Sequence, residues 1–308
     1  MTIPLFDTHA HLISDDWASY PTRAWSADLP VPDRPDYTVT AEALIALMDE
    51  YDVPTACVVQ RGHIYGYDNS YIIDSARAHP GRLLPVVILD TQDHQTPDRF
   101  RDMVRNDRVR GFRMAATRPY HLDTAWMNSP SAMAVWRACA DLNVAMTLIF
   151  FQDHVTYALP ALKMIAQMYP HLPILIDHVG TPYAASNYEM EFAASQGRTI
   201  AMPGPPDFGI DGIVSIFADC PNVFFKLTEI NFERLDDAGH SPARMIRRLA
   251  DRFGAERLVW GSDVGQSVRW SYPEKVAIAR AAADLLKPDE RALFLHDNAA
   301  RIYTGPGS

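Results

Sequence analysis

The stretch Ile3-Pro4-Leu5-Phe6-Asp7-Thr8-His9-Ala10-His11 predicts a short buried strand that ends in a pair of histidines. In an extended strand, residues two apart point to the same face, so His9 and His11 project together and Asp7 shares their face. Such a pair can hold a metal ion or polarise a substrate. Because two nearby histidines are also common on protein surfaces, the rest of the chain decides what the pair means.

Seven further apolar runs follow, with helical patterns between several of them. They cover residues 55–59, 83–89, 111–114, 145–150, 174–176, 223–227 and 258–260. Short, nearly continuous apolar runs are typical of strands buried on both faces in a parallel sheet covered by helices. Eight runs predict a closed (β/α)8 TIM barrel. The long segment 12–37, rich in proline and aromatic residues, is expected to be a loop after the first strand that lies over the barrel mouth.

The chain as a whole fits one barrel domain, residues 1–308. Its 308 residues exceed the usual domain size of roughly 100 to 200, but barrels of this kind run longer as one domain. The hydrophobic content of 48% and charged content of 21% are those of an ordinary globular protein with a large core. We see no linker or change in composition that would divide the chain.

Charge and patterning argue against several classes of partner. The formal net charge of −10 disfavours nucleic acid and anionic membranes, which bind basic surfaces. No apolar run approaches membrane-spanning length, and the first strand begins too early to leave room for a signal peptide. Cys57, Cys139 and Cys220 are widely spaced in apolar segments, as buried thiols are. We therefore expect a cytoplasmic protein.

Two of the later strands end in reactive side chains. His178 follows the run 174–176, and Asp263 follows the run 258–260. Catalytic groups of a (β/α)8 barrel lie at the C-terminal ends of its strands, so we expect these residues to face one mouth with His9 and His11. Three imidazoles and a carboxylate suit Zn²⁺, or the carboxylate acts as the base that takes a proton from water. Both interpretations predict hydrolytic chemistry.

In this order and at these distances, the motifs resemble the amidohydrolase superfamily. The resemblance is to its amidohydrolase-related (amidohydrolase 2) group, which includes sugar lactonases and 2-pyrone-4,6-dicarboxylate lactonase. It covers nearly the whole length and rests on residues 6–11, 110–113, 176–180, 222–227, 260–263 and 298–303. The resemblance implies a (β/α)8 barrel in which His9, His11, His178 and Asp263 take the active-site positions, and are the metal ligands when a metal is bound.

The chain departs from many zinc-dependent relatives at two strand ends. Those relatives carry a carboxylated lysine after strand four or another histidine after strand five, whereas this chain has Arg113 and residues 151–152 there. His154 lies past the expected end of strand five, and we interpret it as a loop histidine. Two mechanisms therefore stay open. One uses a single divalent ion, zinc. The other is metal-independent, as in the pyrone lactonase branch, where the histidines polarise the lactone carbonyl and Asp263 activates water.

Basic residues near the strand ends predict a small anionic substrate. Arg61, Arg113 and Arg118 can grip a carboxylate through two parallel hydrogen bonds. Lys226 lies inside an apolar run, where an ammonium must find an anion or reach solvent. We interpret it as substrate-binding, with a purely structural pairing to Glu229 or Asp263 as the alternative. The Tyr65 side chain is a further candidate, as a hydroxyl donor and a flat wall for a ring.

The sequence thus predicts a hydrolase that opens a small carboxylated or sugar-derived lactone, with Asp263 as the general base. A second hypothesis is a zinc-dependent non-oxidative decarboxylase or hydratase of an aromatic-derived acid. A third is a non-catalytic barrel that binds a small acid. Barrels of this kind often associate, so a homo-oligomer also stays open.

Overall fold

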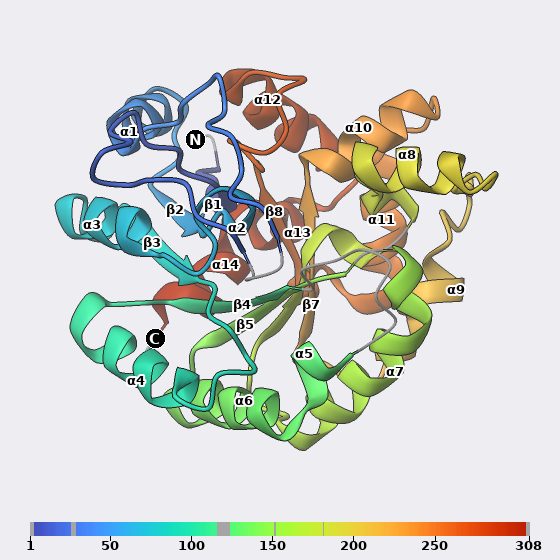
Figure 1. Cartoon of the computed structure of the whole chain (residues 1–308). Helices are drawn as coiled ribbons and strands as arrows, with labels where there is room; N and C mark the ends of the chain where they lie inside the picture. Colours follow the sequence, from blue (N-terminus) through green and yellow to red (C-terminus); the bar gives the residue numbers. More distant parts are fainter. Residues whose placement is uncertain (1–2, 26–28, 116–123, 151, 181, 306–308) are drawn as a thin grey trace.

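The computed structural model describes residues 3–25, 29–115, 124–150, 152–180 and 182–305. Arg118 lies outside these residues. Eight parallel strands follow one another in chain order around the centre of the molecule (Figure 1). They are β1 (Phe6–Ala10), β2 (Thr55–Val59), β3 (Leu83–Val87), β4 (Gly111–Ala115), β5 (Ala145–Ile149), β6 (Ile174–Ile176), β7 (Val223–Thr228) and β8 (Leu258–Gly261). The predicted (β/α)8 barrel is confirmed.

The barrel closes between its first and last strands. The backbone N–H of Asp263 donates to the His9 carbonyl at 2.7 Å, and that of His11 donates to the Val264 carbonyl at 2.8 Å. A parallel bridge joins Ala10 to Val264. These bonds continue the ladder just past the end of β8, so the residues after β1 and β8 are held side by side.

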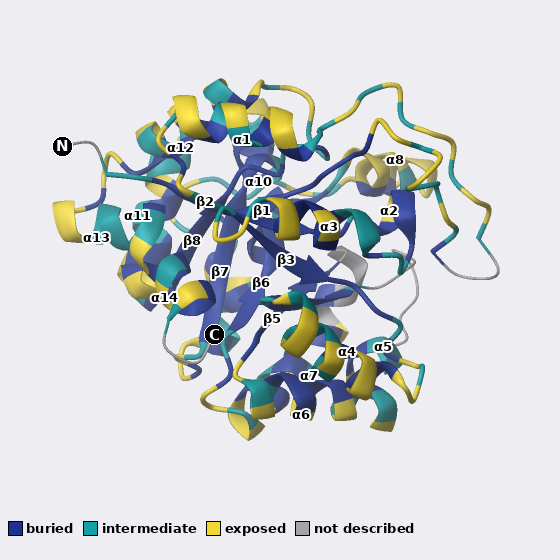
Figure 2. Cartoon of the chain, turned by 90° about the vertical axis from the view of Figure 1, so that its left-hand side faces the viewer, coloured by how far each residue is buried: buried dark blue, intermediate teal, exposed yellow. Residues whose placement is uncertain are grey.

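Helices surround the strands, with their outer faces exposed and the strands buried (Figure 2). The helices are α1 (Ala41–Glu50), α2 (Gly62–Tyr65), α3 (Ser70–Ala78), α4 (Thr96–Asp107), α5 (Ala125–Asn128), α6 (Pro130–Leu142), α7 (Gln152–Met168), α8 (Asn187–Ser195), α9 (Ile210–Ile213), α10 (Glu229–Asp237), α11 (Pro242–Phe253), α12 (Tyr272–Ala282), α13 (Pro288–Ala292) and α14 (Asn298–Thr304). The Thr40 hydroxyl caps α1 by accepting from the Ala43 N–H at 3.2 Å. None of the helices in the described ranges is long and apolar enough to cross a membrane.

Two large apolar clusters account for most of the burial, beside a small third one of Ile13, Ile64 and Tyr65. The larger lies between the strands and the helices. The smaller joins residues of the strands, among them Phe6 and Phe224, to Ile302 and Tyr303 of α14. The rings of Phe6 and Tyr303 stack with centroids 6.1 Å apart. This packing gives the strand ends that carry the histidines a rigid support.

Two details differ from the sequence-based expectations, namely the register of β1 and the position of His154. The pairing of β1 with β2 shifts register between Asp7 and Ala10, which interrupts the strict two-residue period. The Asp7 carboxylate accepts hydrogen bonds from the backbone N–H groups of His9, at 3.0 Å, and Ser262, at 2.8 Å, so it supports β1 and the start of the loop after β8. His154 lies in α7 rather than in a loop.

Candidate active site

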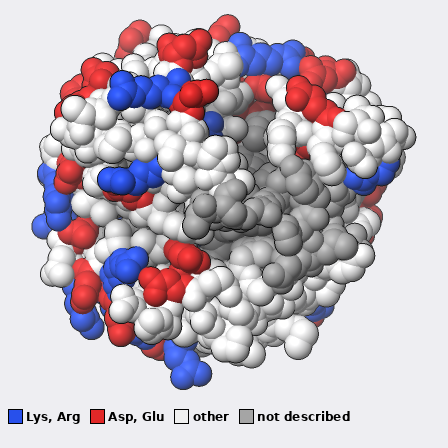
Figure 3. Space-filling view, viewed as in Figure 1, with Lys and Arg blue, Asp and Glu red and all other residues white. Residues whose placement is uncertain are grey.

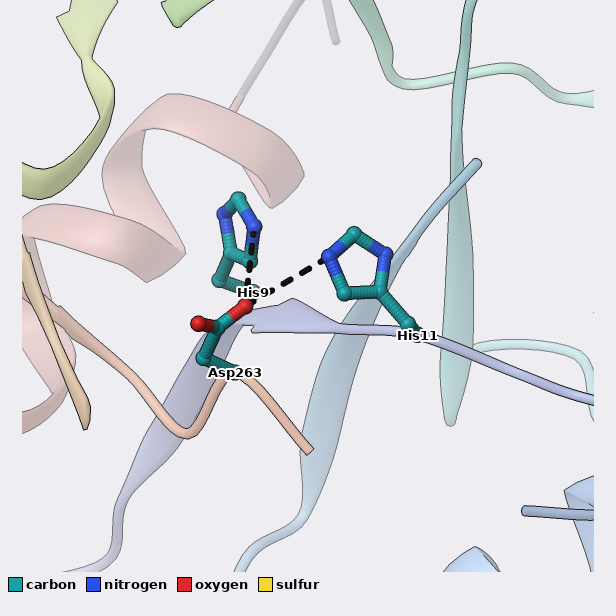
Figure 4. Close-up of side chains that lie close together, drawn as sticks. All are labelled: His9, His11 and Asp263. Carbon is teal, nitrogen blue, oxygen red and sulfur yellow. Dashed lines mark ion pairs between the residues drawn. The ribbon is translucent and has the colours of Figure 1, made fainter. Parts of the chain in front are cut away.

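The structure brings the predicted histidines and the aspartate together at one end of the barrel. His9 is in β1, His11 follows it, His178 follows β6 and Asp263 follows β8. The Nε2 atoms of His9 and His11 each lie 3.5 Å from Oδ1 of Asp263 (Figure 4). The ring centroids of His9 and His178 are 5.2 Å apart. Groups separated by up to 254 residues in the sequence therefore meet because parallel strands end at the same edge.

The backbone at this edge is tight. Asp263 and His178 both have positive φ, +52° and +56°, in the left-handed region that residues other than glycine rarely adopt. Such strain is found where the surrounding structure enforces it, often at functional sites. Gly261 lies directly against β1, since a Cβ added there would be 2.5 Å from the His9 Cβ. A glycine is required for β8 to approach the histidine strand this closely.

The imidazole rings of His11 and His178 are each held by a hydrogen-bond contact at Nδ1. The His11 Nδ1 lies 2.7 Å from the Val59 carbonyl oxygen, which can only accept, so this nitrogen carries the proton. The His11 Nε2 then presents a lone pair to Asp263. The His178 Nδ1 lies 2.6 Å from the Thr228 hydroxyl, and Asn231 donates to the His178 carbonyl at 2.8 Å. The rings are thus held in fixed orientations by strand and helix residues.

Electrostatics keep the carboxylate charged and the rings neutral. Burial alone would raise the pKa of Asp263, but the imidazoles of His9, His11 and His178 around the carboxylate bring this pKa below its usual range. Burial lowers the pKa of His11 to about 4 and also lowers the pKa of His178. Neither Asp263 oxygen has a hydrogen-bond partner among the described residues, although the side chain is buried. The site therefore contains an ionised carboxylate with both oxygens free to accept.

A buried ion cluster lies beside this group. The Asp177 carboxylate accepts from the Arg113 Nε at 2.9 Å and lies 2.9 Å from the Lys226 Nζ. Lys226 is fully buried and also lies 3.3 Å from the His9 Nδ1. The partners of Lys226 are thus Asp177 and His9. The pairing with Glu229 or Asp263 that the sequence left open as an alternative is not the one in the structure. Sequence reasoning missed Asp177, although it directly precedes His178.

The site opens into a cavity of about 1040 Å³. Among the residues that line it are His11, Arg61, Arg113, His178 and Asp263. Further wall comes from α8, α10 and the segment after β8. Basic and acidic side chains are interspersed over the face of the molecule shown in Figure 3. Arg61 and Arg113 line the cavity beside the histidines. The Arg61 Nε donates to the Gly265 carbonyl at 3.2 Å, which ties it to the loop after β8.

The long loop after β1 reaches the cavity as expected. Trp25 and Leu29 line it, and the edge of the Trp25 ring meets His63 with centroids 4.5 Å apart. His63 is a cavity residue that sequence reasoning missed, although it is two residues from Arg61. Tyr65 is buried, and its hydroxyl accepts from the Ser14 N–H at 2.9 Å. In the structure Tyr65 therefore holds the long loop.

Comparison with known proteins identifies the family of the chain. The family model described as Amidohydrolase matches residues 6–305. The chain belongs to the amidohydrolase family. This amidohydrolase is 29% identical over 249 residues to L-fucono-1,5-lactonase of Burkholderia ambifaria, a match that covers 77% of this chain and 75% of the relative.

Solved structures of low sequence identity share the fold of this amidohydrolase. A probable 2-pyrone-4,6-dicarboxylic acid hydrolase from Acinetobacter baumannii with citric acid bound has a TM-score of 0.71 at 17% identity, covering 97% of this chain and 99% of that one. An amidohydrolase from Burkholderia multivorans with bound zinc has a TM-score of 0.66 at 19% identity, covering 98% and 99%. A 2,6-dihydroxybenzoate decarboxylase from Rhizobium has a TM-score of 0.61 at 14% identity, covering 98% and 99%.

Proposed function

We propose that this amidohydrolase opens a small lactone, carboxylated or derived from a sugar, by hydrolysis of its ester bond. The observation that carries the proposal is Asp263, a buried carboxylate whose two oxygens lack a hydrogen-bond partner in the described part of the chain. A base of this kind, open to a cavity, can take the proton from an attacking water. The similarity to L-fucono-1,5-lactonase supports a lactone as the substrate.

The residues around Asp263 have separate roles in this reaction. Asp263 removes a proton from the water that attacks the lactone carbonyl. The Thr228 hydroxyl can donate to the His178 Nδ1, which leaves a proton on the other ring nitrogen to polarise the carbonyl oxygen. Arg113 lines the cavity while its Nε is held by Asp177, and together with Arg61 it would orient an anionic substrate.

The donor set also fits a divalent metal ion. Ligand atoms of His9, His11 and Asp263 lie within 4.8 Å of one another. The His9 Nε2 and both Asp263 oxygens are buried polar atoms without a hydrogen-bond partner among the described residues, and a cation would satisfy them. Imidazole nitrogen and carboxylate oxygen are among the usual ligands of zinc, and His178 is adjacent. A zinc ion held there would lower the pKa of a water and polarise the carbonyl.

We further propose a small anionic molecule as the partner and the cytoplasm as the location. Arg61 and Arg113 line the cavity beside the histidines, which supports an anion. Cys57, Cys139 and Cys220 are free and buried, which is compatible with a reducing compartment.

Product analysis tests the proposed reaction. The protein is incubated with sugar 1,5-lactones and with 2-pyrone-4,6-dicarboxylate, and proton release is followed with an indicator dye. We expect one proton per molecule opened and no carbon dioxide. Carbon dioxide released from carboxylated phenols, together with no opening of any lactone, would contradict the proposal and favour a decarboxylase.

A further inference from the structure

The His9 ring has two neighbours that make opposite demands on its Nδ1. The Lys226 Nζ lies 3.3 Å from this nitrogen, and the Asp177 Oδ1 lies 3.5 Å from it. An ammonium can only donate, so it requires a lone pair on Nδ1. A carboxylate can only accept, so it requires a proton there. The position of the His9 proton therefore depends on which neighbour prevails.

The distances favour the ammonium. Lys226 lies 2.9 Å from the Asp177 Oδ1, so this oxygen already has a close cationic partner. Arg113 binds the other oxygen of Asp177 at 2.9 Å. With a proton on the His9 Nδ1, that N–H would point at the Lys226 ammonium 3.3 Å away, two donors facing each other. With a lone pair on Nδ1, the ammonium bridges Asp177 and His9 without conflict.

This arrangement has a consequence on the opposite side of the ring. A neutral imidazole with a lone pair on Nδ1 carries its proton on Nε2, and the His9 Nε2 faces Asp263 at 3.5 Å. A protonated nitrogen cannot bind a metal ion. His11 has the opposite arrangement, because the Val59 carbonyl fixes its proton on Nδ1. His9 thus presents an N–H donor to the Asp263 carboxylate, whereas His11 presents a lone pair to it.

We propose that Lys226 is a positioning residue that keeps the His9 proton on Nε2 and so opposes metal binding at His9, His11 and Asp263. Metal binding requires the proton to move to Nδ1, where Asp177 would accept it. The positive charge of Lys226 next to the site also repels a cation, so it too opposes metal binding. The inference rests on the site of the proposed function, but its test needs no substrate.

The first test is the tautomer of His9 in the metal-free protein. Nitrogen NMR of the protein with ¹⁵N-labelled histidine distinguishes a protonated ring nitrogen from one with a lone pair, and the His9→Gln variant assigns the signal. We expect the proton on Nε2 in the wild-type protein. A proton on Nδ1 would overturn the proposal, whatever the protein's substrate is.

The second test uses Lys226→Met, which removes the ammonium and leaves Arg113 to neutralise Asp177. We expect the His9 proton to move to Nδ1 and zinc to bind roughly tenfold or more tightly, measured by competition with a chelating dye. Lys163→Met is the control, since it removes a lysine from a partly exposed ion pair with Asp219 at 2.8 Å, outside the site. Its zinc affinity and His9 signal should match the wild type.

Each outcome decides the question. Zinc affinity that is unchanged or weaker in Lys226→Met overturns the proposal. Tighter zinc binding with the proton still on Nε2 also overturns it, because the charge alone would then explain the change. Circular dichroism and a thermal melt show whether the variant folds. If Lys226→Met does not fold, the tautomer of His9 in the wild-type protein tests the proposal by itself.

Discussion

Gly261→Ala is the substitution that most directly tests how the fold positions the site. The added Cβ would lie 2.5 Å from the His9 Cβ and 2.9 Å from the His9 backbone nitrogen. Ordinary contact begins at 3.4 Å, so β1 and β8 must separate by about 1 Å at this point. The backbone itself is in the way, so no change of rotamer relieves the contact.

The expected losses of stability and of catalytic efficiency in Gly261→Ala follow from this displacement. Extra volume in a packed core costs about 1 to 3 kcal/mol, and we expect the free energy of unfolding to fall by this amount. His9 moves relative to Asp263, and a misplacement of about 1 Å lowers catalytic efficiency about 10²-fold. Urea unfolding measures the first quantity. The kcat/KM for a lactone that the wild-type protein opens measures the second.

Gly212→Ala is the matched control, since a Cβ at Gly212 meets nothing within 4 Å. It should leave kcat/KM at the wild-type level and should not lower stability, since alanine replaces glycine within α9 without a clash. A Gly261→Ala protein with wild-type stability and kcat/KM would refute the reasoning that close packing of β8 on β1 positions the histidines.

Three further predictions concern charge. Asp177→Asn leaves Lys226 and Arg113 without their buried counterion, so urea unfolding should show a loss of about 3 to 5 kcal/mol, and an unchanged midpoint would contradict the pairing. Because the pKa of His11 falls to about 4 in the fold, the unfolded state binds a proton more readily below about pH 6.5. His11 alone should therefore lower the free energy of unfolding by about 3 kcal/mol as the pH drops from 6.5 to 4, so His11→Asn should show a shallower slope than the wild type; equal slopes would argue against a neutral His11. Arg61→Met should raise the KM of an anionic lactone about tenfold or more with little change in kcat, and an unchanged KM would remove Arg61 from the binding site.

The barrel could be predicted because its strands are local patterns. Each of the eight apolar runs corresponds to one observed strand, and the run 83–89 contains β3, Leu83–Val87. The position of His9, His11, His178 and Asp263 at one end follows from the rule that parallel strands end together. No knowledge of side-chain contacts was needed for either inference.

The pairing of buried charges could not be predicted, because it depends on which side chains meet across the barrel. Lys226 pairs with Asp177, 49 residues earlier in the chain, and with His9 on another strand. Nothing in the sequence around Lys226 distinguishes Asp177 from Glu229 as a partner. Likewise the register shift after Asp7 and the bond from Ser14 to Tyr65 arise from tertiary packing.

If Asp263 activates water for lactone hydrolysis, the turnover of Asp263→Asn must fall. The asparagine keeps the shape of the side chain and removes the base. The control Asp98→Asn removes an exposed carboxylate that pairs only with Arg101 among the described residues. We expect a fall in kcat of about 10²- to 10⁴-fold for Asp263→Asn and none for the control. Wild-type turnover by a folded Asp263→Asn protein would contradict this role of Asp263.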